Sequence, residues 1–187
     1  MSKIILGFTG PIASGKDVSK KYLIEKYGAS AFRFSTVMRD LLVRLGLEIN
    51  RYNLSHLSTS LRQTFGEDLF ARTVARDVRG AETDLIVVDG IRRLADIEHL
   101  KDIPGFHLVA IDADPRVRFE RLVTRNENVG DNTKTFEQFQ RDASELETEI
   151  SIPVVMEQAA LKIDNSTSFE ALYAQIDKII ADIKNKL

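Results

Sequence analysis

The sequence has no cysteine among its 187 residues and no apolar run near the roughly 20 residues that a membrane-spanning helix needs. Without cysteine the chain forms neither disulfides nor thiolate metal sites, so we expect a cytoplasmic protein. Basic residues are not in excess, since 26 lysines and arginines stand against 28 acidic residues, for a formal net charge of −2. That balance argues against a general nucleic-acid binder but allows a local basic pocket. We therefore expect neither a membrane nor a nucleic acid as partner.

Histidine is also scarce. His56, His99 and His107 show no metal-ligand spacing, and nothing in their pattern suggests a histidine catalyst. The chain has no internal repeat, low-complexity tract or linker, so we expect one domain spanning residues 1–187.

Short apolar runs alternate with longer amphipathic segments. We expect strands at 3–9, 31–34, 85–88, 106–111 and 160–163. We expect helices at 16–27, 36–45, 67–78, 93–101, 115–125 and 136–150, one capped by Asn53 or Ser55 and ending at Phe65, and one capped by Ser166 or Ser168 and ending near Lys184. The first apolar run is too short, and too soon followed by Gly10 and Pro11, for a secretory signal. Strands that alternate with helices predict an α/β fold whose parallel sheet is covered on both faces.

The strongest motif is Gly10-Pro11-Ile12-Ala13-Ser14-Gly15-Lys16, which fits G-x-x-x-x-G-K between an expected strand and an expected helix. Its glycines let the backbone curl so that N–H groups point at phosphate oxygens, and the helix adds its positive end. Lys16 is expected to reach the β- and γ-phosphates and to act in catalysis as the γ-group leaves. The motif predicts binding of a nucleoside triphosphate, ATP, with Mg²⁺. We expect nucleotide contacts from Gly10, Ala13, Ser14, Gly15, Lys16, Asp17 and Val18.

The residue after Lys16 is usually Ser or Thr, whose hydroxyl binds Mg²⁺, but here it is Asp17. A carboxylate also binds Mg²⁺, directly or through water, so Asp17 is a candidate metal ligand. Its extra negative charge predicts a steeper dependence of nucleotide affinity on Mg²⁺. The alternative is an acidic residue that simply favours the first turn of a helix.

With this motif, the chain resembles the nucleoside-monophosphate-kinase group of P-loop kinases, which includes adenylate kinases and dephospho-CoA kinases. It looks most like the short archaeal-type adenylate-kinase-related proteins, over nearly its whole length. The resemblance implies a three-layer sandwich with a five-stranded parallel sheet in the order 2-3-1-4-5. It also implies an acceptor-binding helical insert at about 35–80 and a short lid at about 126–141. Residues 7–16 look more like dephospho-CoA kinase, whereas 89–90 and 118–142 look more like the adenylate-kinase-related proteins, so the acceptor stays open.

Two polar segments follow expected strands, where α/β proteins bind ligands. The segment after the second strand resembles the one in adenylate kinases where a Ser/Thr and an Arg hold the acceptor monophosphate, which implies Ser35 and Arg39. Residues 88–93 resemble the D-G-x-x-R after strand three, which implies that Asp89 holds Mg²⁺ through water and that Arg92 faces the acceptor phosphate. The alternatives are a helix cap, a turn aspartate and solvated arginines.

Arginines flank the polar loop near residue 130. Arg118, Arg121 and Arg125 lie on one face of the expected helix before it, and Arg141 follows it. In the resembled family, lid arginines close over the transferring phosphoryl group and exclude water. The resemblance thus implies catalytic roles for Arg121, Arg125 and Arg141 and a nucleotide contact for Arg118. The alternative is a charged outer face.

Two further residues complete the expected site. Arg62 is a candidate for the acceptor site, and Asn165 resembles the turn that touches the nucleotide base, with plain turn chemistry as its alternative. We expect a kinase that transfers the γ-phosphoryl of Mg·ATP to a nucleoside or deoxynucleoside monophosphate. One alternative is a dephospho-CoA kinase, whose hydroxyl acceptor needs a base such as Asp17 or Asp40. The other is a regulatory P-loop ATPase without a small-molecule acceptor.

Overall fold

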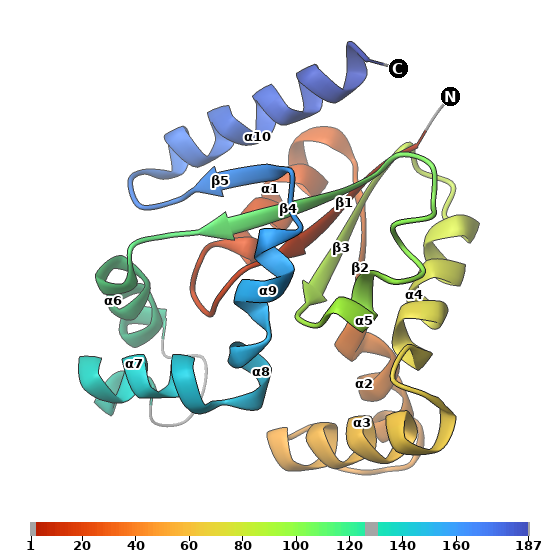
Figure 1. The fold of residues 1–187 in the computed structure, drawn as a ribbon, viewed down its shortest axis with the longest axis vertical. Helices are drawn as coiled ribbons and strands as arrows, with labels where there is room; N and C mark the ends of the chain where they lie inside the picture. The colour runs from red at the N-terminus through yellow and green to blue at the C-terminus, as the bar shows by residue number, and fades with distance from the viewer. Residues whose placement is uncertain (1–2, 126–130, 187) are drawn as a thin grey trace.

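Five parallel strands form the centre of the molecule, in the order β2-β3-β1-β4-β5 (Figure 1). The computed structural model describes residues 3–125 and 131–186. The strands are β1 (Ile4–Thr9), β2 (Ser30–Arg33), β3 (Leu85–Ile91), β4 (Phe106–Asp112) and β5 (Leu161–Asp164). Neighbouring strands pair in parallel throughout this order. The expected α/β class and the expected strand order are confirmed.

Helices cover both faces of the sheet. They are α1 (Lys16–Tyr27), α2 (Phe34–Arg44), α3 (Arg51–Phe65), α4 (Leu69–Gly80), α5 (Leu94–Ile97), α6 (Pro115–Arg125), α7 (Phe136–Glu145), α8 (Glu147–Ile150), α9 (Ile152–Glu157) and α10 (Phe169–Lys184), with a 3₁₀ turn η1 (Asp131–Thr133). In residues 3–125 and 131–186, no helix has the length and apolar character that crossing a membrane requires.

The alternation of side chains along β1 explains the three layers. Ile4, Leu6 and Phe8 are buried in a core shared with α1 and α10. Ile5 is buried in a second core, on the opposite face, shared with α4 and α9. Successive side chains of a strand point to opposite faces, so a strand buried on both sides is apolar without interruption.

The parallel arrangement brings the carboxyl ends of all five strands to one edge. Figure 1 shows the arrowheads of the strands pointing toward that edge, with α2 and α3 beyond it on one side and α6 and α7 on the other. Residues that follow the strands therefore gather between these two pairs of helices, as expected for an α/β ligand site.

Several expected boundaries differ from those of the structure. Phe34 opens α2 instead of ending β2, because Arg33 is the last residue of β2 that pairs with β3. The helix expected at 93–101 is limited to α5. The Asp96 carboxylate accepts from two backbone N–H groups at the start of this helix, and after Ile97 the chain continues in turns.

The start of α3 was placed too late. Its cap is Asn50, whose side chain accepts from the N–H of Asn53 at 2.8 Å, so neither Asn53 nor Ser55 begins the helix. The expected cap of α10 is confirmed for Ser168, whose Oγ accepts from the N–H of Ala171 at 3.3 Å. Side-chain caps of this kind satisfy N–H groups that a helix leaves open.

The single helix expected at 136–150 is also wrong. The chain leaves the helical conformation at Leu146 (φ −73°, ψ 122°), and two short helices, α8 and α9, follow. No glycine or proline stands at the break, so the pattern carried no signal for it. The lid predicted at 126–141 includes residues 126–130, which lie outside the described residues. The divisions of the chain into insert and lid stay predictions.

Candidate nucleotide site

The loop between β1 and α1 curls because its two glycines have backbone angles that suit no other residue. Gly10 has φ +149°, and a Cβ there would lie 2.0 Å from the carbonyl oxygen of Ile111. Gly15 has φ +108°, and a Cβ there would lie 2.1 Å from Nδ2 of Asn165. Ala13 between them also has a positive φ, of 59°. Such a curl directs backbone N–H groups inward, which is the arrangement that holds phosphate.

Lys16 folds back over this loop. Its Nζ donates to the carbonyl oxygens of Gly10 at 2.6 Å and Pro11 at 2.8 Å. Burial lowers the pKa of Lys16 to about 8, although the charge of Asp89 opposes the shift and that of Arg92 adds to it. The ammonium is therefore poorly solvated, and its hydrogen bonds go to neutral oxygens, including Oγ of Ser14 at 3.5 Å, so an anion brought to the loop would stabilise it.

Asn165 ties the end of β5 to the loop. It is 1% exposed, and its Nδ2 donates to the carbonyl oxygen of Ser14 at 2.8 Å. Its Oδ1 is buried and, among the described residues, has no hydrogen-bond partner. The structure thus brings Asn165 to the loop as expected, and its contact with a base stays a prediction.

Val18, in the first turn of α1, packs against the core under α1 and α10.

Asp17 and Asp89, the two expected metal ligands, converge on one cation. The Nζ of Lys20 lies 2.8 Å from Oδ1 of Asp17 and 2.8 Å from Oδ2 of Asp89. Partial burial raises the pKa of the Asp17 carboxyl, but the hydrogen bond and charge of Lys20 outweigh this, so the pKa is lowered overall. Two carboxylate oxygens aimed at a single positive point fit a divalent cation, and these residues could hold Mg²⁺.

The expected acceptor residues divide into two groups. Ser35 and Arg39 lie in α2, directly after β2, and Arg92 directly follows β3. The buried Oγ of Ser35 and Nε of Arg39 have no hydrogen-bond partner in the part of the chain that the structure describes. Unpaired buried donors of this kind call for a ligand or ordered water. Arg92 is exposed and is close enough to Lys16 for its charge to lower the pKa of that lysine.

Arg62 lies in a different environment. It is 8% exposed, and its Nη2 donates to Oδ1 of Asp96 at 3.1 Å, while its guanidinium lies 5.0 Å from the ring centre of Phe70. It also donates to the carbonyl oxygen of Glu67. These contacts hold Arg62 between α3, α4 and α5, although its Nε is buried without a hydrogen-bond partner among the described residues.

The arginines near the expected lid are placed differently from one another. Arg118 is 9% exposed and donates through Nε to the carbonyl oxygen of Ala113 at 3.0 Å. Within residues 3–125 and 131–186, Nη1 of Arg118 and Nη1 of Arg121 are buried without hydrogen-bond partners. Nη1 of Arg125 lies 3.8 Å from Oδ2 of Asp17, which brings α6 to the P-loop. Arg141 is exposed on α7 and makes none of these contacts in the described chain.

Two residues at this site were missed by sequence reasoning. Lys20 lies three residues after Asp17, a spacing that puts them on one helix face and was a usable signal. Glu149 is 9% exposed, and its Oε2 accepts from the P-loop N–H of Ile12 at 3.2 Å. No local pattern marks Glu149, because its position depends on the break at Leu146.

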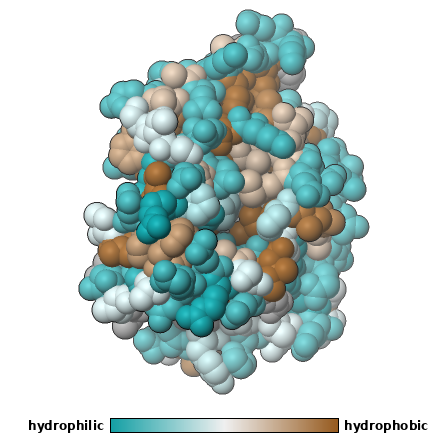
Figure 2. All heavy atoms as spheres, turned by 60° about the vertical axis from the view of Figure 1, so that its left-hand side comes forward, coloured by the Kyte–Doolittle hydropathy of each residue, from teal (hydrophilic) through white to brown (hydrophobic). Residues whose placement is uncertain are grey.

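Two hollows lie on the side of β4 and β5, and one of them adjoins the loop. One, of about 500 Å³, is lined by Pro11, Arg118 and Glu149 among others. The other, of about 470 Å³, lies at the ends of β4 and β5 and is lined by Asp112 and Ser166 among others. Figure 2 turns the face with α6 and α7 forward, and this face is largely hydrophilic with separate apolar areas. The surroundings fit a ligand with both polar and apolar parts.

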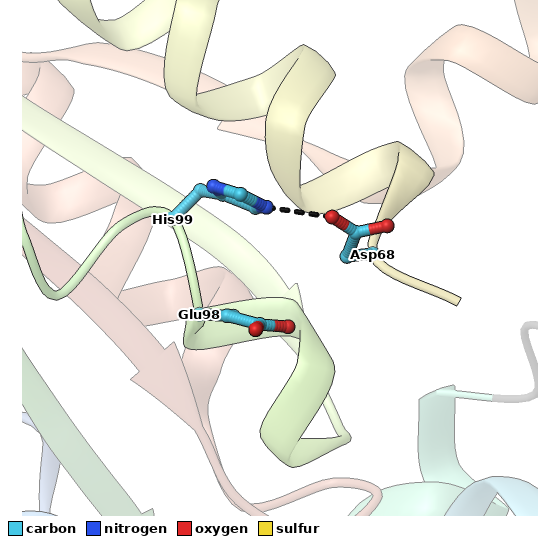
Figure 3. Close-up of side chains that lie close together, drawn as sticks. All are labelled: Asp68, Glu98 and His99. Atoms are coloured by element: carbon cyan, nitrogen blue, oxygen red, sulfur yellow. Dashed lines mark hydrogen bonds and ion pairs between the residues drawn. The ribbon is translucent and has the colours of Figure 1, made fainter. Parts of the chain in front are cut away.

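A separate polar cluster joins the start of α4 to the end of α5. Figure 3 shows His99 hydrogen-bonded to Asp68, at 2.7 Å, with Glu98 beside them and no bond drawn to it. The ligand atoms of the three residues lie within 4.8 Å of one another, as in a possible metal site. The hydrogen bond from His99 lowers the pKa of Asp68, and Arg72 adds its charge at 3.5 Å. The hydrogen bond to His99 and the ion pair with Arg72 account for the position of the half-buried Asp68.

Comparisons with known proteins agree with this geometry. A family model described as an AAA domain matches residues 9–140. The UPF0200 protein TK1334 of Thermococcus kodakarensis is 30% identical over 190 residues, which cover 98% of this chain and 100% of that protein. The UPF0200 protein MJ1399 of Methanocaldococcus jannaschii is 28% identical over 187 residues, which cover 98% of this chain and 92% of that protein.

Solved structures share the fold. A shikimate kinase from Bacteroides thetaiotaomicron has a TM-score of 0.62 at 12% identity and covers 97% of this chain and 98% of its own. TT1252 from Thermus thermophilus has a TM-score of 0.61 at 19% identity, with the same coverage of both chains. Fold and loop together define a P-loop protein, with a fold that the shikimate kinase shares. The chain belongs to the AAA-domain family whose model it matches, and it is related over nearly its whole length to the UPF0200 proteins.

Proposed function

We propose that this protein transfers the γ-phosphoryl group of Mg·ATP to a nucleoside or deoxynucleoside monophosphate. The observation that carries the proposal is the set of arginine and serine donors left unpaired on α2 and α6, the helices beyond the carboxyl ends of the strands. Nε of Arg39, Oγ of Ser35 and Nη1 of Arg121 are buried without partners in the described residues. A buried donor without a partner costs about 1–3 kcal/mol, and an anionic ligand would remove that cost. Both a nucleotide and a monophosphate supply such anions.

The proposed roles follow the three parts of the site. The donor nucleotide would be bound by Gly10, Ala13, Ser14, Gly15, Lys16, Asp17, Val18, Arg118 and Asn165. The acceptor would be bound by Ser35, Arg39 and Arg92. Arg62 is also predicted to bind the acceptor, although its buried ion pair with Asp96 does not favour this role. The transferring group would be stabilised by Lys16, Arg121, Arg125 and Arg141.

Asp17 and Asp89 would hold Mg²⁺. The ion would supply charge neutralisation on the β- and γ-phosphates. The fit rests on the two carboxylates that converge on Lys20 at 2.8 Å each. A location in the cytoplasm stays a prediction.

The chemistry asked of the protein is positioning and electrostatics. Lys16 would exchange the carbonyls of Gly10 and Pro11 for phosphate oxygens, a stronger partner for an ammonium that burial has stripped of water. Arg121 and Arg125, on α6 beside the loop, would meet the charge that develops on the transferring group. A monophosphate acceptor already carries an anionic oxygen, so its attack requires no strong base.

A hydroxyl acceptor, as in a dephospho-CoA kinase, is the second candidate. It would need a general base, and a carboxylate stands at the loop, since Glu149 accepts from the N–H of Ile12 at 3.2 Å. The bases expected from sequence are less suited, because Asp17 is paired with Lys20 and Asp40 is exposed. A solved relative in fold, the shikimate kinase from Acinetobacter baumannii, is described in complex with shikimate, which is not a nucleotide.

ADP release from Mg·ATP tests the proposal. The acceptor panel contains every ribo- and deoxynucleoside monophosphate, dephospho-CoA, shikimate and water alone. Lys16→Ala should abolish the reaction, and Lys21→Ala, on the exposed side of the same helix, should not. Stimulation by a nucleoside monophosphate supports the proposal, and stimulation by a hydroxyl acceptor alone supports the second candidate. Slow hydrolysis that no acceptor changes would indicate a regulatory ATPase instead.

A further inference from the structure

Lys20 lies where the two candidate metal ligands meet. Its ammonium is 2.8 Å from Asp17 and 2.8 Å from Asp89, and the side chain of Lys20 is 20% exposed. Asp89 is 3% exposed, at the end of a central strand, so its carboxylate depends on nearby cations for compensation. Arg33 is a second cation near Asp89, with Nε at 3.8 Å, and the charge of Lys16 also interacts with this carboxylate.

Lys20 contacts the same oxygen atoms that a metal would use. Mg²⁺ binds carboxylate oxygens at about 2.0–2.1 Å and needs their lone pairs, which in this structure accept hydrogen bonds from an ammonium. A divalent ion that approached both oxygens would also meet the positive charge of Lys20 at close range. The ammonium and the metal therefore compete for one position.

The charge balance favours the ammonium until a nucleotide arrives. Two carboxylates, Asp17 and Asp89, are surrounded by Lys20, Arg33 and Arg125, all within 4 Å of one of them. Phosphates would add the negative charge that this group lacks, and they would also give Lys20 another anion to contact.

We propose that Lys20 is a resident cation that holds Asp17 and Asp89 together in the nucleotide-free protein and excludes free divalent ions, so that the metal binds only with the nucleotide. Lys20 is a positioning residue in this account, since it acts through the two carboxylates. The inference rests on the part of the proposed function that gives Asp17 and Asp89 to Mg²⁺. It also explains how an acidic residue is tolerated at the end of the P-loop motif.

Binding of Mn²⁺ to the nucleotide-free protein, followed by electron paramagnetic resonance, tests this inference without any turnover. Wild type should bind Mn²⁺ weakly. Lys20→Gln should bind it about tenfold or more tightly, because a full positive charge next to the ligand oxygens has been removed. Lys20→Arg keeps the charge and should bind as weakly as wild type.

Lys21→Gln is the matched control, because it removes the same charge from the next position, where Lys21 pairs at 3.7 Å with exposed Glu25. It should leave Mn²⁺ binding unchanged. Adding Asp17→Asn to Lys20→Gln should abolish the gain. Circular dichroism checks that each variant is folded.

Two outcomes would overturn the inference, and they differ in what they say about the site. If Lys20→Gln binds Mn²⁺ no better than Lys21→Gln, while Asp17→Asn still weakens Mn·ATP binding, Lys20 does not exclude the metal and the metal assignment stands. If Asp17→Asn changes neither the binding of Mn²⁺ nor the binding of Mn·ATP, the assignment of Asp17 to the metal fails, and the inference fails with it. Acceptor stimulation of ADP release is independent of both results.

Discussion

The carboxylate of Glu149 accepts a hydrogen bond from the backbone N–H of Ile12, across 3.2 Å. This amide belongs to the loop that would receive the phosphates, and Glu149 is 9% exposed. An anion here occupies one donor of the loop and repels further negative charge. The loop is thus partly occupied by a carboxylate of the protein itself, from α8.

Removing that charge should strengthen nucleotide binding. We expect Glu149→Gln to tighten Mg·ATP binding by about threefold to tenfold, which is on the order of 1 kcal/mol. Isothermal titration calorimetry with Lys16→Ala as the non-binding reference measures it. Glu145→Gln, an exposed glutamate at the end of α7, is the control and should change nothing. Weaker binding in Glu149→Gln would mean that the carboxylate supports the bound state.

Asn165 supports the loop through one buried hydrogen bond to Ser14, of 2.8 Å. We expect Asn165→Ala to lower the free energy of unfolding by about 1–2 kcal/mol, because the carbonyl of Ser14 then lacks that donor. The affinities for ATP and GTP should fall by the same factor, since the loop and not the base is affected. Thermal denaturation measures the stability and calorimetry measures the two nucleotide affinities, with Asn132→Ala, at an exposed position, as control. A loss confined to one nucleotide would favour the predicted contact with the base.

Arg39 has an unpaired buried Nε, so its substitution should affect the acceptor. We expect Arg39→Met to raise the KM for the acceptor by roughly tenfold or more, the loss of about one charge-assisted hydrogen bond. The melting temperature and the affinity for Mg·ATP should change little. Steady-state kinetics at saturating ATP measures the acceptor KM separately from the affinity for Mg·ATP. An unchanged acceptor KM would remove Arg39 from the acceptor site.

Arg62 should give the opposite result. It forms a buried ion pair with Asp96, and breaking such a pair leaves an uncompensated charge, at a cost of roughly 3–5 kcal/mol. We expect Arg62→Met to lower the melting temperature strongly, while the acceptor KM of the folded fraction stays near that of wild type. A raised KM in a protein of normal stability would return Arg62 to the acceptor site.

The pH dependence of stability should report on Asp177, which accepts hydrogen bonds from Tyr22 at 2.8 Å and Tyr27 at 2.7 Å and pairs with Lys26 at 2.7 Å. Burial raises the pKa of this carboxyl, but the hydrogen bonds from Lys26 and the two tyrosines outweigh it, so the pKa is lowered below 3.8. A lowered pKa contributes stability above the unfolded value, and this is lost as the pH falls through the folded value.

Asp177→Asn should therefore destabilise the protein at pH 7, by on the order of 1 kcal/mol because the carboxylate is partly exposed to solvent. The difference from wild type should shrink below about pH 4. Melting temperatures between pH 3 and pH 7, on the order of five points, measure it. Asp182→Asn, exposed on the same helix, is the control. A difference that persists unchanged at low pH would show that charge is not the cause.

The P-loop and the sheet could be predicted because their signals are local. Glycines, Lys16 and a strand before them fall within a few residues, and apolar runs report burial on both faces of the sheet. The order of strands could not be obtained in this way, since it depends on contacts between distant segments. It was taken from a resemblance, and the structure confirms it.

The residues that were missed depend on such distant contacts. Lys20 has its second partner, Asp89, 69 residues away, and Glu149 contacts Ile12 across 137 residues. Arg62 was a candidate for the acceptor site from its position on that helix, and its ion pair with Asp96, 34 residues away, is another distant contact. Periodicity assigns a residue to a helix face but does not identify what that face will meet.

The hydrogen bond from Asn165 to Ser14 spans 151 residues, and it has a consequence for synthesis. A ribosome makes the chain from its amino end, so the loop is translated long before the residue that fastens it. Until β5 and the turn after it have emerged and paired with β4, the nascent loop lacks this support. Competence to hold a triphosphate should thus appear late in translation, after the sheet has been completed at its last edge.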